Sequence, residues 1–358
     1  MDALIASASA LEPDAGQQLA FLRQLQRLFQ EGDFTSTYKY ALLLALAELA
    51  IECDGHAGAE LVLPMERIAG KFAEFYWLQS LPYSADATGN HGVLFQNSGL
   101  QVAVIGHLTA LRDLGISTLS QARQHPHWPR TLEAIASRVR DMPVPRLQSL
   151  SGSSVVFLFD PATVGKTLTL LPGVAFHLRR FQGFIQQLVR AGWVNYIRSN
   201  NKNASLVGQG ADLEAFLFMT PRAALAKVEQ LLSPLQDRRC FFCQQGLHEK
   251  GDVDHFIPWS RYPRDTALNF VLAHKKCNTD KRDLLAGGAH LDRWLERNAR
   301  EGATIAGQLQ QAGFVSEPGV EMMVASWAYR EGVSAGVQVW QGCGNTTRIS
   351  PDVMQSFG

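Results

Sequence analysis

Four potential metal ligands lie between residues 240 and 277 of this chain. Cys240 and Cys243 form one pair and His274 and Cys277 form another, with two residues between the members of each pair. This spacing places both members of a pair on one tight turn, so two pairs can surround a zinc ion tetrahedrally and leave no position for water. The sequence therefore predicts a structural zinc site. The alternatives are a site that uses His248 in place of His274, or two core cysteines beside an unrelated surface histidine.

A second set of polar residues lies between and just after these ligand pairs. The segment from Asp252 to Pro258 is apolar apart from its acidic and histidine residues, and it is typical of a strand that ends in a loop. His255 can take a proton from water near neutral pH, whereas the Asp254 carboxylate offers a hard oxygen ligand to a divalent cation. Asn278, at the start of a predicted helix, supplies a second oxygen ligand. A cation held by two protein groups keeps positions for water and a phosphate.

Together these residues resemble an HNH endonuclease, a nuclease with the ββα-metal fold. The resemblance covers about residues 236–286 and matches the form in which CxxC pairs brace the fold. The DVDH run that ends at His255, and the nine-residue step from Asn269 to Asn278, are similar to the HNH domain of RNA-guided CRISPR nucleases. His274 stands where a cysteine is usual, an exchange that zinc chemistry accepts.

The resemblance implies a role for each matching residue. His255 would be the general base that activates the attacking water, and Asp254 and Asn278 would bind a catalytic Mg²⁺ or Mn²⁺ ion. Asn269 would hold the histidine-bearing loop through backbone hydrogen bonds. Lys281 would be the basic residue near the phosphate. The implied reaction is hydrolysis of phosphodiester bonds in nucleic acid, and we expect double-stranded DNA as the substrate.

Helical periodicity dominates the chain outside this segment. The most apolar stretch, Tyr38 to Cys53, contains Lys39 and Glu48 and is too short to span a membrane, so we expect a buried core helix. Spacing of apolar residues predicts further helices over residues 16–30, 63–77, 100–115, 130–141, 221–233, 291–311 and 320–340.

A basic stretch at residues 173–203 is a candidate nucleic-acid contact. Its basic residues, with no acidic residue among them, are Arg179, Arg180, Arg190, Arg198 and Lys202. We predict a helix to about Val189, a turn at Gly192 and a short strand over 193–197, which resembles one half of a winged helix that grips duplex phosphates. The alternative is an amphipathic helix whose arginines are solvated. Val155 to Phe159 is a further predicted strand.

These patterns predict an α+β, predominantly α-helical fold with a small ββα-metal HNH module inserted among helical regions. We expect a helical N-terminal domain at 1–150, a mixed α/β, winged-helix-like segment at 151–212, an HNH module with structural zinc at 213–286, and a helical region at 287–358 that packs on the rest.

Charge and cysteine content set the expected environment. The 358 residues contain 33 Lys and Arg and 33 Asp and Glu, so any contact with nucleic acid must come from local patches. Sparse cysteine with zinc-bound thiols suits a reducing cytoplasm. No basic region followed by an apolar core is visible at the N-terminus, so we expect no signal peptide and no membrane partner.

Two classes of function follow from the sequence. The first is a metal-dependent endonuclease of restriction or antiphage defence, and for this class a partner subunit and a dimeric state stay open. The second is a catalytically inactive zinc module that binds nucleic acid or protein. The set of His255, Asn269 and Asn278 beside Asp254 favours the enzyme, because a zinc knuckle needs none of them.

Overall fold

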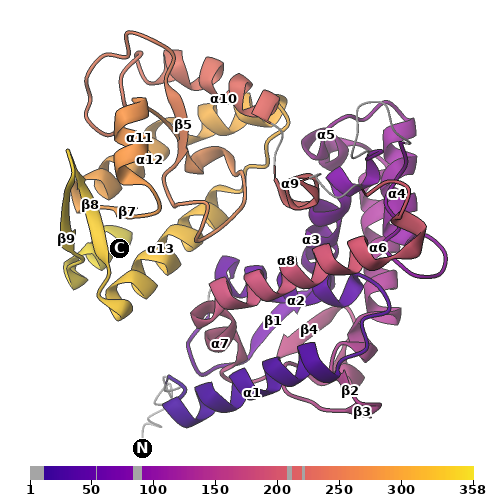
Figure 1. Cartoon of the computed structure of the whole chain (residues 1–358). Helices are drawn as coiled ribbons and strands as arrows, with labels where there is room; N and C mark the ends of the chain where they lie inside the picture. The colour runs from indigo at the N-terminus through magenta and orange to yellow at the C-terminus, as the bar shows by residue number, and fades with distance from the viewer. Residues whose placement is uncertain (1–11, 54, 84–90, 208–211, 220–221) are drawn as a thin grey trace, which may run out of the picture. The chain divides into compact units, whose positions relative to one another are not determined.

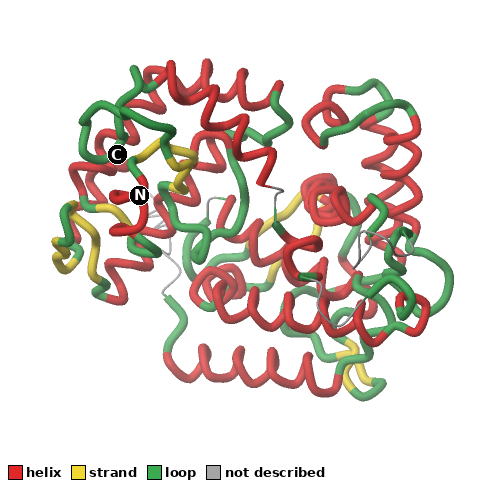
Figure 2. Tube along the Cα trace, turned by 45° about the horizontal axis from the view of Figure 1, so that its top comes forward, coloured by secondary structure: helices red, strands yellow, loops and turns green. Residues whose placement is uncertain are grey.

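The computed structural model describes residues 12–53, 55–83, 91–207, 212–219 and 222–358. The chain divides into two compact units, one formed by residues 1–115 and 126–218 and the other by residues 116–125 and 219–358. Helices predominate in both units, and the strands form sheets of only two or three members (Figures 1 and 2). The expected α+β, predominantly α-helical fold class is confirmed. None of the described helices is long and apolar enough to cross a bilayer.

The first unit is built around α2 (Tyr38–Glu52), which is buried along its whole length. Helices α3 (Met65–Trp77), α7 (Val174–Arg180) and α8 (Gln182–Ser199) pack against it. Its two buried glutamates, Glu48 and Glu52, form ion pairs with the buried ammonium of Lys71 from α3, as buried charges require. The predicted core helix is therefore confirmed, because a helix that is apolar on most sides is stable only when it is enclosed.

The remaining elements of the first unit surround this core. Helix α1 begins after Asp14, whose side chain accepts a hydrogen bond from the Gln17 amide, a reciprocal cap of the first turn. The other helices and strands are α1 (Ala15–Glu31), β1 (Leu61–Pro64), α4 (Ala103–Asp113), α6 (Trp128–Asp141), β2 (Ser149–Leu150), β3 (Ser153–Ser154), β4 (Thr167–Leu170) and α9 (Leu213–Phe218).

The prediction of half a winged helix at 173–203 is wrong. Helix α8 continues without interruption through Gly192 to Ser199, so residues 193–197 are helical and no wing follows a strand. Gly192 suggested a turn, but it lies where α8 passes close to the buried ring of Tyr40: a Cβ atom there would lie 2.5 Å from Tyr40 Cε1. The glycine allows two elements to approach closely, which is a different use of the same residue.

The predicted strand at Val155 to Phe159 is also wrong. Only Phe159 makes an isolated bridge, with Leu170. The strand of this region is instead β4, which pairs antiparallel with β1 so that Leu61 faces Leu170 and Pro64 faces Thr167. Residues from both sides of the predicted boundary near 150 thus belong to one unit, and the predicted boundary at 212 adjoins residues 208–211, which lie outside the described residues.

The second unit contains a ribbon of two short strands followed by a helix. Strand β5 (Asp252–His255) pairs antiparallel with β6 (Phe270–Ala273), with His255 opposite Phe270. Helix α11 (Lys275–Lys281) follows directly and contacts β5. The helix was expected to begin at Asn278, but His274 is its N-cap and Asn278 is the middle one of its seven residues. This order of strand, strand and helix is the one that the resemblance implied.

Three long helices enclose this ribbon: α10 (Arg222–Leu235), α12 (Gly288–Gln311) and α13 (Pro318–Ala335). Helices α10 and α12 share with the ribbon a core that contains the buried side chains Val228, Leu232, Ala267, Leu268, Phe270, Leu272, Ile305, Leu309 and Phe314. The short helix α5 (Leu119–Gln124), although far away in sequence, packs on α12, where Ser120 Oγ donates to the Gln310 carbonyl over 2.8 Å.

Strands and a final 3-10 helix (Pro351–Phe357) follow the last α-helix of the chain. The helix predicted over 320–340 stops at Ala335, where Gly336 adopts a left-handed φ of 61°. Strand β8 (Gln338–Gly342) then pairs parallel with β7 (Leu285–Ala286) and antiparallel with β9 (Asn345–Arg348). Trp340 is consequently a strand residue, buried against the second unit's core.

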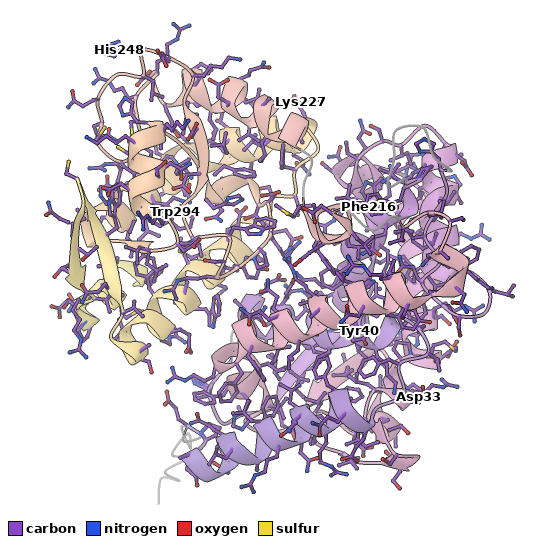
Figure 3. The ribbon with its side chains drawn as sticks, viewed as in Figure 1. Asp33, Tyr40, Phe216, Lys227, His248 and Trp294 are labelled. Atoms are coloured by element: carbon purple, nitrogen blue, oxygen red, sulfur yellow. The ribbon has the colours of Figure 1, made fainter. Side chains whose placement is uncertain are left out.

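A pair of glycine substitutions in α8 tests the close approach to Tyr40 (Figure 3). We predict that Gly192→Ala lowers the free energy of unfolding by about 1–3 kcal/mol, because its Cβ would overlap the Tyr40 ring. Gly183→Ala, at an exposed position of the same helix with open space around it, should be neutral or stabilising by up to about 1 kcal/mol. Urea unfolding of both variants measures their free energies of unfolding. Equal urea midpoints for the two variants would contradict the packing argument.

Candidate functional site

The four predicted zinc ligands come together in the second unit. The ligand atoms of Cys240, Cys243, His274 and Cys277 all lie within 4.8 Å of one another, a spacing that fits a tetrahedral zinc ion. Cys243 Sγ lies 3.3 Å from His274 Nδ1. The first pair sits on a turn closed by the Gln244 amide, which donates to the Cys240 carbonyl. The second pair flanks the start of α11.

A backbone carbonyl orients His274, and the other thiols of the cluster surround Cys277. His274 Nε2 lies 3.1 Å from the Gly246 carbonyl, which fixes Nδ1 as the nitrogen that faces the sulfurs. Burial, and then the charges of Cys240 and Cys243, raise the pKa of the Cys277 thiol to about 12. Three thiolates at this spacing need a cation to remain deprotonated together. His248 is exposed on an outer loop and is not part of the cluster (Figure 3).

His255 lies at the end of β5, with its ring held by an acid that the sequence patterns did not reveal. His255 Nε2 is 2.5 Å from Asp265 Oδ1. The imidazole ring also packs on Trp259 and Phe270, at centroid distances of 5.2 and 5.1 Å. Asp265 lies in the loop between β5 and β6, ten residues after the histidine, and no spacing rule connects the two. Only the path of this loop brings the carboxylate to the ring.

Asn269 closes the loop that follows His255. Its Oδ1 accepts a hydrogen bond from the Ile257 amide over 2.7 Å, and its Nδ2 donates to the Ile257 carbonyl over 3.0 Å. The Phe256 amide donates to the Asn269 carbonyl over 2.8 Å. Asn269 is buried, so its side chain contacts the loop backbone and not solvent.

Asp254 and Lys281 form a buried ion pair beside His255. The Lys281 ammonium has no exposed surface, lies 3.0 Å from Asp254 Oδ2 and donates to the His255 carbonyl over 3.0 Å. Burial raises the pKa of the Asp254 carboxyl, and the charge of Lys281 opposes that shift. Lys281 was expected near the phosphate, but here it supports the strand from within.

The residues that could hold a catalytic cation are Asp254 and Asn278. Asp254 Oδ2 lies 3.0 Å from the Lys281 ammonium, so a metal ion at this carboxylate would share it with Lys281 or bind its other oxygen. Asn278 Nδ2 donates to Asp252 Oδ2 over 3.5 Å, which directs its amide oxygen away from that carboxylate. This donor set of one carboxylate and one amide oxygen fits Mg²⁺ or Mn²⁺, with the other positions left for water and phosphate.

Side chains from α12 and α13 hold the backbone around Asn269. The Leu268 carbonyl accepts from Trp294 Nε1 over 2.9 Å and from the Arg297 guanidinium over 2.6 Å. Arg297 also donates to the Phe270 carbonyl, and its complete burial lowers its pKa to about 10. From the other helix, Glu321 Oε1 accepts from the Leu268 amide over 3.0 Å. Sequence patterns missed these three supports, although Trp294 had been assigned to the core.

The basic residues at 173–203 do not share one exposed surface. Arg179 donates to the carbonyls of Ala50, Cys53 and Gly55 and so caps the end of α2. Arg190 is half-buried, with its guanidinium 4.9 Å from the Phe218 ring centre, and burial lowers its pKa. Arg180 is half-buried, whereas Arg198 and Lys202 are exposed. A nucleic-acid contact at these last two stays a prediction.

Two families match separate parts of the chain. Residues 18–215, more than half of the chain, match the family described as "Domain of unknown function (DUF8808)". The chain belongs to the DUF8808 family. Residues 244–286 match a family described as "HNH endonuclease". Nothing among curated proteins or solved structures matches.

The HNH match confirms the resemblance for the segment that carries the ribbon and α11. It begins directly after Cys243 and includes Asp254, His255, Asn269 and Asn278. The DUF8808 match covers most of the first unit and ends before α10. The family boundary thus agrees with the division into two units better than with the predicted boundary at residue 150.

Glu321 provides a pH-dependent test of the support for the Asn269 loop. Burial raises the pKa of its carboxyl from 4.5 to about 7, so the folded state keeps a proton that the unfolded state loses near pH 4.5. Folding therefore takes up a proton in this window, and raising the pH from about 4.5 to 7 weakens the fold. The contribution amounts to at most a few kcal/mol, since one pKa unit corresponds to about 1.4 kcal/mol.

We predict that Glu321→Gln flattens the decline of stability between pH 5 and 8 and is more stable than the wild type at pH 8, because Gln keeps an acceptor for the Leu268 amide without the charge. Thermal unfolding against pH is the measurement. Glu296→Gln, an exposed position on α12, serves as the matched control and should leave the wild-type profile unchanged. A Glu321→Gln profile parallel to that of wild type would contradict the assignment.

Proposed function

We propose that this protein is a metal-dependent endonuclease that hydrolyses phosphodiester bonds of DNA. The observation that carries the proposal is the grouping around β5: Asp254 and His255 at its end, Asp265 on the histidine ring, and Asn269 on the backbone that follows. A bare zinc module requires no such arrangement. The HNH match over 244–286 supports a nuclease function for the same residues.

In this proposal His255 is the general base. When Nε2–H donates to Asp265, the lone pair of the neutral ring is on Nδ1, and Nδ1 is the atom that takes the proton from the attacking water. The carboxylate holds the ring in one tautomer and one orientation, and Trp259 and Phe270 limit its rotation. Asp265 is therefore a positioning residue: it orients the ring that takes the proton and does not contact the water itself.

Asp254 and Asn278 would hold the catalytic cation. A Mg²⁺ or Mn²⁺ ion there supplies positive charge for the phosphate and for the leaving oxygen. The chain's own contribution is to bury Asp254 beside Lys281 and to orient the Asn278 amide through Asp252. Lys281 reduces the cost of burying the carboxylate.

The zinc cluster would be structural in this mechanism. Its four protein ligands leave no position for substrate. Its place between the turn at Cys240 and the first turn of α11 ties together the two ends of a module too small for a large core. From α12, Arg293 donates to the carbonyls of Phe241 and Phe242, which holds the first ligand pair against the rest of the unit.

The biological setting is a further part of the proposal. An HNH module joined to a helical DUF8808 unit suggests restriction or antiphage defence, with double-stranded DNA as the substrate, by analogy of domain architecture. A partner subunit, a dimeric state and a cytoplasmic location stay predictions. Digestion of plasmid, single-stranded DNA and RNA side by side identifies the substrate class.

The catalytic assignment is tested with His255→Ala. With Mg²⁺ or Mn²⁺ present, we predict a loss of cleavage rate of about 10²–10⁴-fold, because the water loses its base. His248→Ala, an exposed histidine in the same unit, is the matched control and should cut like the wild type. If His255→Ala cut DNA as fast as the wild type, the mechanism would be wrong. If neither protein cut DNA, a zinc module without catalytic activity would be the better explanation.

The zinc assignment is tested by exchanging cysteine for serine at two positions. Cys277→Ser is predicted to lose most of the bound zinc and to lower the melting temperature, because a structural zinc site contributes directly to folding. Cys343→Ser, an exposed cysteine outside the cluster, should retain about one zinc per chain. Metal analysis of the purified proteins is the measurement. Equal zinc content in the two variants would contradict the assignment. His274→Cys should retain the metal, because cysteine is also a zinc ligand.

A further inference from the structure

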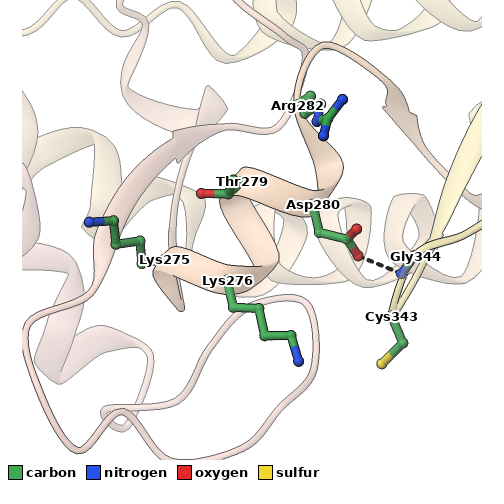
Figure 4. A pocket seen from close by; sticks show the side chains of 7 residues that line it. All are labelled: Lys275, Lys276, Thr279, Asp280, Arg282, Cys343 and Gly344. Atoms are coloured by element: carbon green, nitrogen blue, oxygen red, sulfur yellow. Dashed lines mark hydrogen bonds between the residues drawn. The ribbon is translucent and has the colours of Figure 1, made fainter.

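A surface groove of about 780 Å³ lies beside α11, outside the grouping described above. It is lined by seven residues, from α11 and its C-terminal end on one side and the turn between β8 and β9 on the other (Figure 4): Lys275, Lys276, Thr279, Asp280, Arg282, Cys343 and Gly344. The β8–β9 hairpin is outside the segment that matches HNH endonucleases, so the groove combines an HNH helix with a separate part of this chain.

The basic residues of this groove lack close ion pairs with other described residues, whereas its acidic residue accepts hydrogen bonds. Lys275, Lys276 and Arg282 are exposed, and none of them forms a close ion pair with another described residue. The one acid, Asp280, is already engaged: its Oδ2 accepts hydrogen bonds from the Gly344 amide over 2.6 Å and from Trp340 Nε1 over 2.9 Å. These hydrogen bonds leave Asp280 charged, and its charge acts on Lys276 and Arg282. Three cations against one acid still give the groove an excess of positive charge, beside the hydroxyl of Thr279, for an anion.

The spacing of the cations fits a chain of anions better than a single ion. Lys275 and Thr279 are four residues apart and share a face of α11, and Arg282 follows seven residues after Lys275. The axial distance from Lys275 to Arg282 is roughly 10 Å at 1.5 Å per residue. One DNA strand places a phosphate about every 3.4 Å along the duplex axis, and neighbouring phosphates lie farther apart along the strand itself, so this distance spans more than one phosphate.

The same short helix also carries residues of the proposed active site. Lys281 points into the unit and contacts Asp254, and Asn278 contacts Asp252 on β5. A nucleic-acid strand in the groove would therefore run along α11 next to the candidate metal ligands. This relation favours a nucleic acid over an acidic protein as the occupant.

We propose that this groove binds the phosphate backbone of the strand that is cut, an inference that rests on the proposed nuclease function. The hairpin forms the second wall. It is held to α11 by Asp280, and its turn is defined by positive φ angles at Gly342, Cys343 and Gly344. Strand β9 is exposed along its whole length, so the wall is open to a long polymer.

Binding without cutting separates this proposal from the proposed function. All proteins carry His255→Ala, and the probes are a labelled DNA duplex and a single strand of the same length, each titrated between 50 and 200 mM salt. Lys275→Ala with Lys276→Ala removes two cations. Arg282→Gly removes the third and relaxes the backbone, since Arg282 has a φ of 51°, where glycine is favoured. Loss of binding by this variant is therefore not explained by unfolding.

We expect each groove variant to weaken binding by about fivefold or more and to reduce the slope of log affinity against log salt by about 0.9 per lost contact for duplex, or about 0.7 for single strand. Lys227→Ala, an exposed lysine on α10, is the matched control and should change neither quantity (Figure 3). The strand form with the larger change identifies the occupant. Affinities and slopes equal to those of the control would overturn the proposal.

Cys343 gives a second readout at the groove itself. Its thiol is exposed at the turn, so a neutral alkylating reagent should modify it quickly, and bound DNA should slow that reaction several-fold. The protection should disappear in the double lysine variant. Unchanged alkylation by saturating DNA would overturn the proposal even if the wild type cuts DNA. Protection in a chain whose wild type never cuts would leave the groove in place and overturn the nuclease function.

Discussion

The position of the Asn269 loop depends on a buried arginine. The ribbon of β5 and β6 has four residues in each strand and is followed by a seven-residue helix, which is too little to hold a catalytic loop alone. Arg297 places its guanidinium under this ribbon and donates to the carbonyls of Leu268 and Phe270, one on each side of Asn269. Asn269 in turn fixes Ile257, two residues after His255. A chain of direct contacts thus runs from α12 to the backbone that follows His255.

A buried cation is a demanding way to support a loop. Removing a guanidinium from water is costly, and its five N–H groups must all find acceptors. The carbonyls of Leu268 and Phe270 accept hydrogen bonds from Arg297. The buried guanidinium thus finds acceptors, and the two carbonyls find a donor. Glu321 adds an acceptor for the Leu268 amide. The C-terminal helices are therefore part of the site and not only a cover for it.

This division explains what sequence reasoning could reach. The zinc ligands and the HNH residues were recognisable because each depends on short spacing: two residues within a ligand pair, and consecutive positions on a strand. Asp265, Arg297 and Glu321 act across ten or more residues, where no periodicity links them to His255. Gly192 illustrates the opposite error, since a glycine read as a turn allows α8 to pass Tyr40. The same local pattern has two physical causes, and only packing distinguishes them.

Charge counts along the chain show the same dependence on packing. Arg179 stood out among basic residues without acidic neighbours, yet it caps α2 and is unavailable to a polymer. On α11, Lys281 is fully buried while Lys275 and Lys276 are exposed, although all three lie within one seven-residue helix. Helical geometry separates them. Lys281 faces β5 and pairs with the buried carboxylate of Asp254, whereas Lys275 and Lys276 face the groove and form no close ion pair with another described residue. In a chain with equal numbers of acidic and basic residues, this sorting leaves three cations against the one acid Asp280 in the groove, and the proposed attraction for phosphate rests on that local excess.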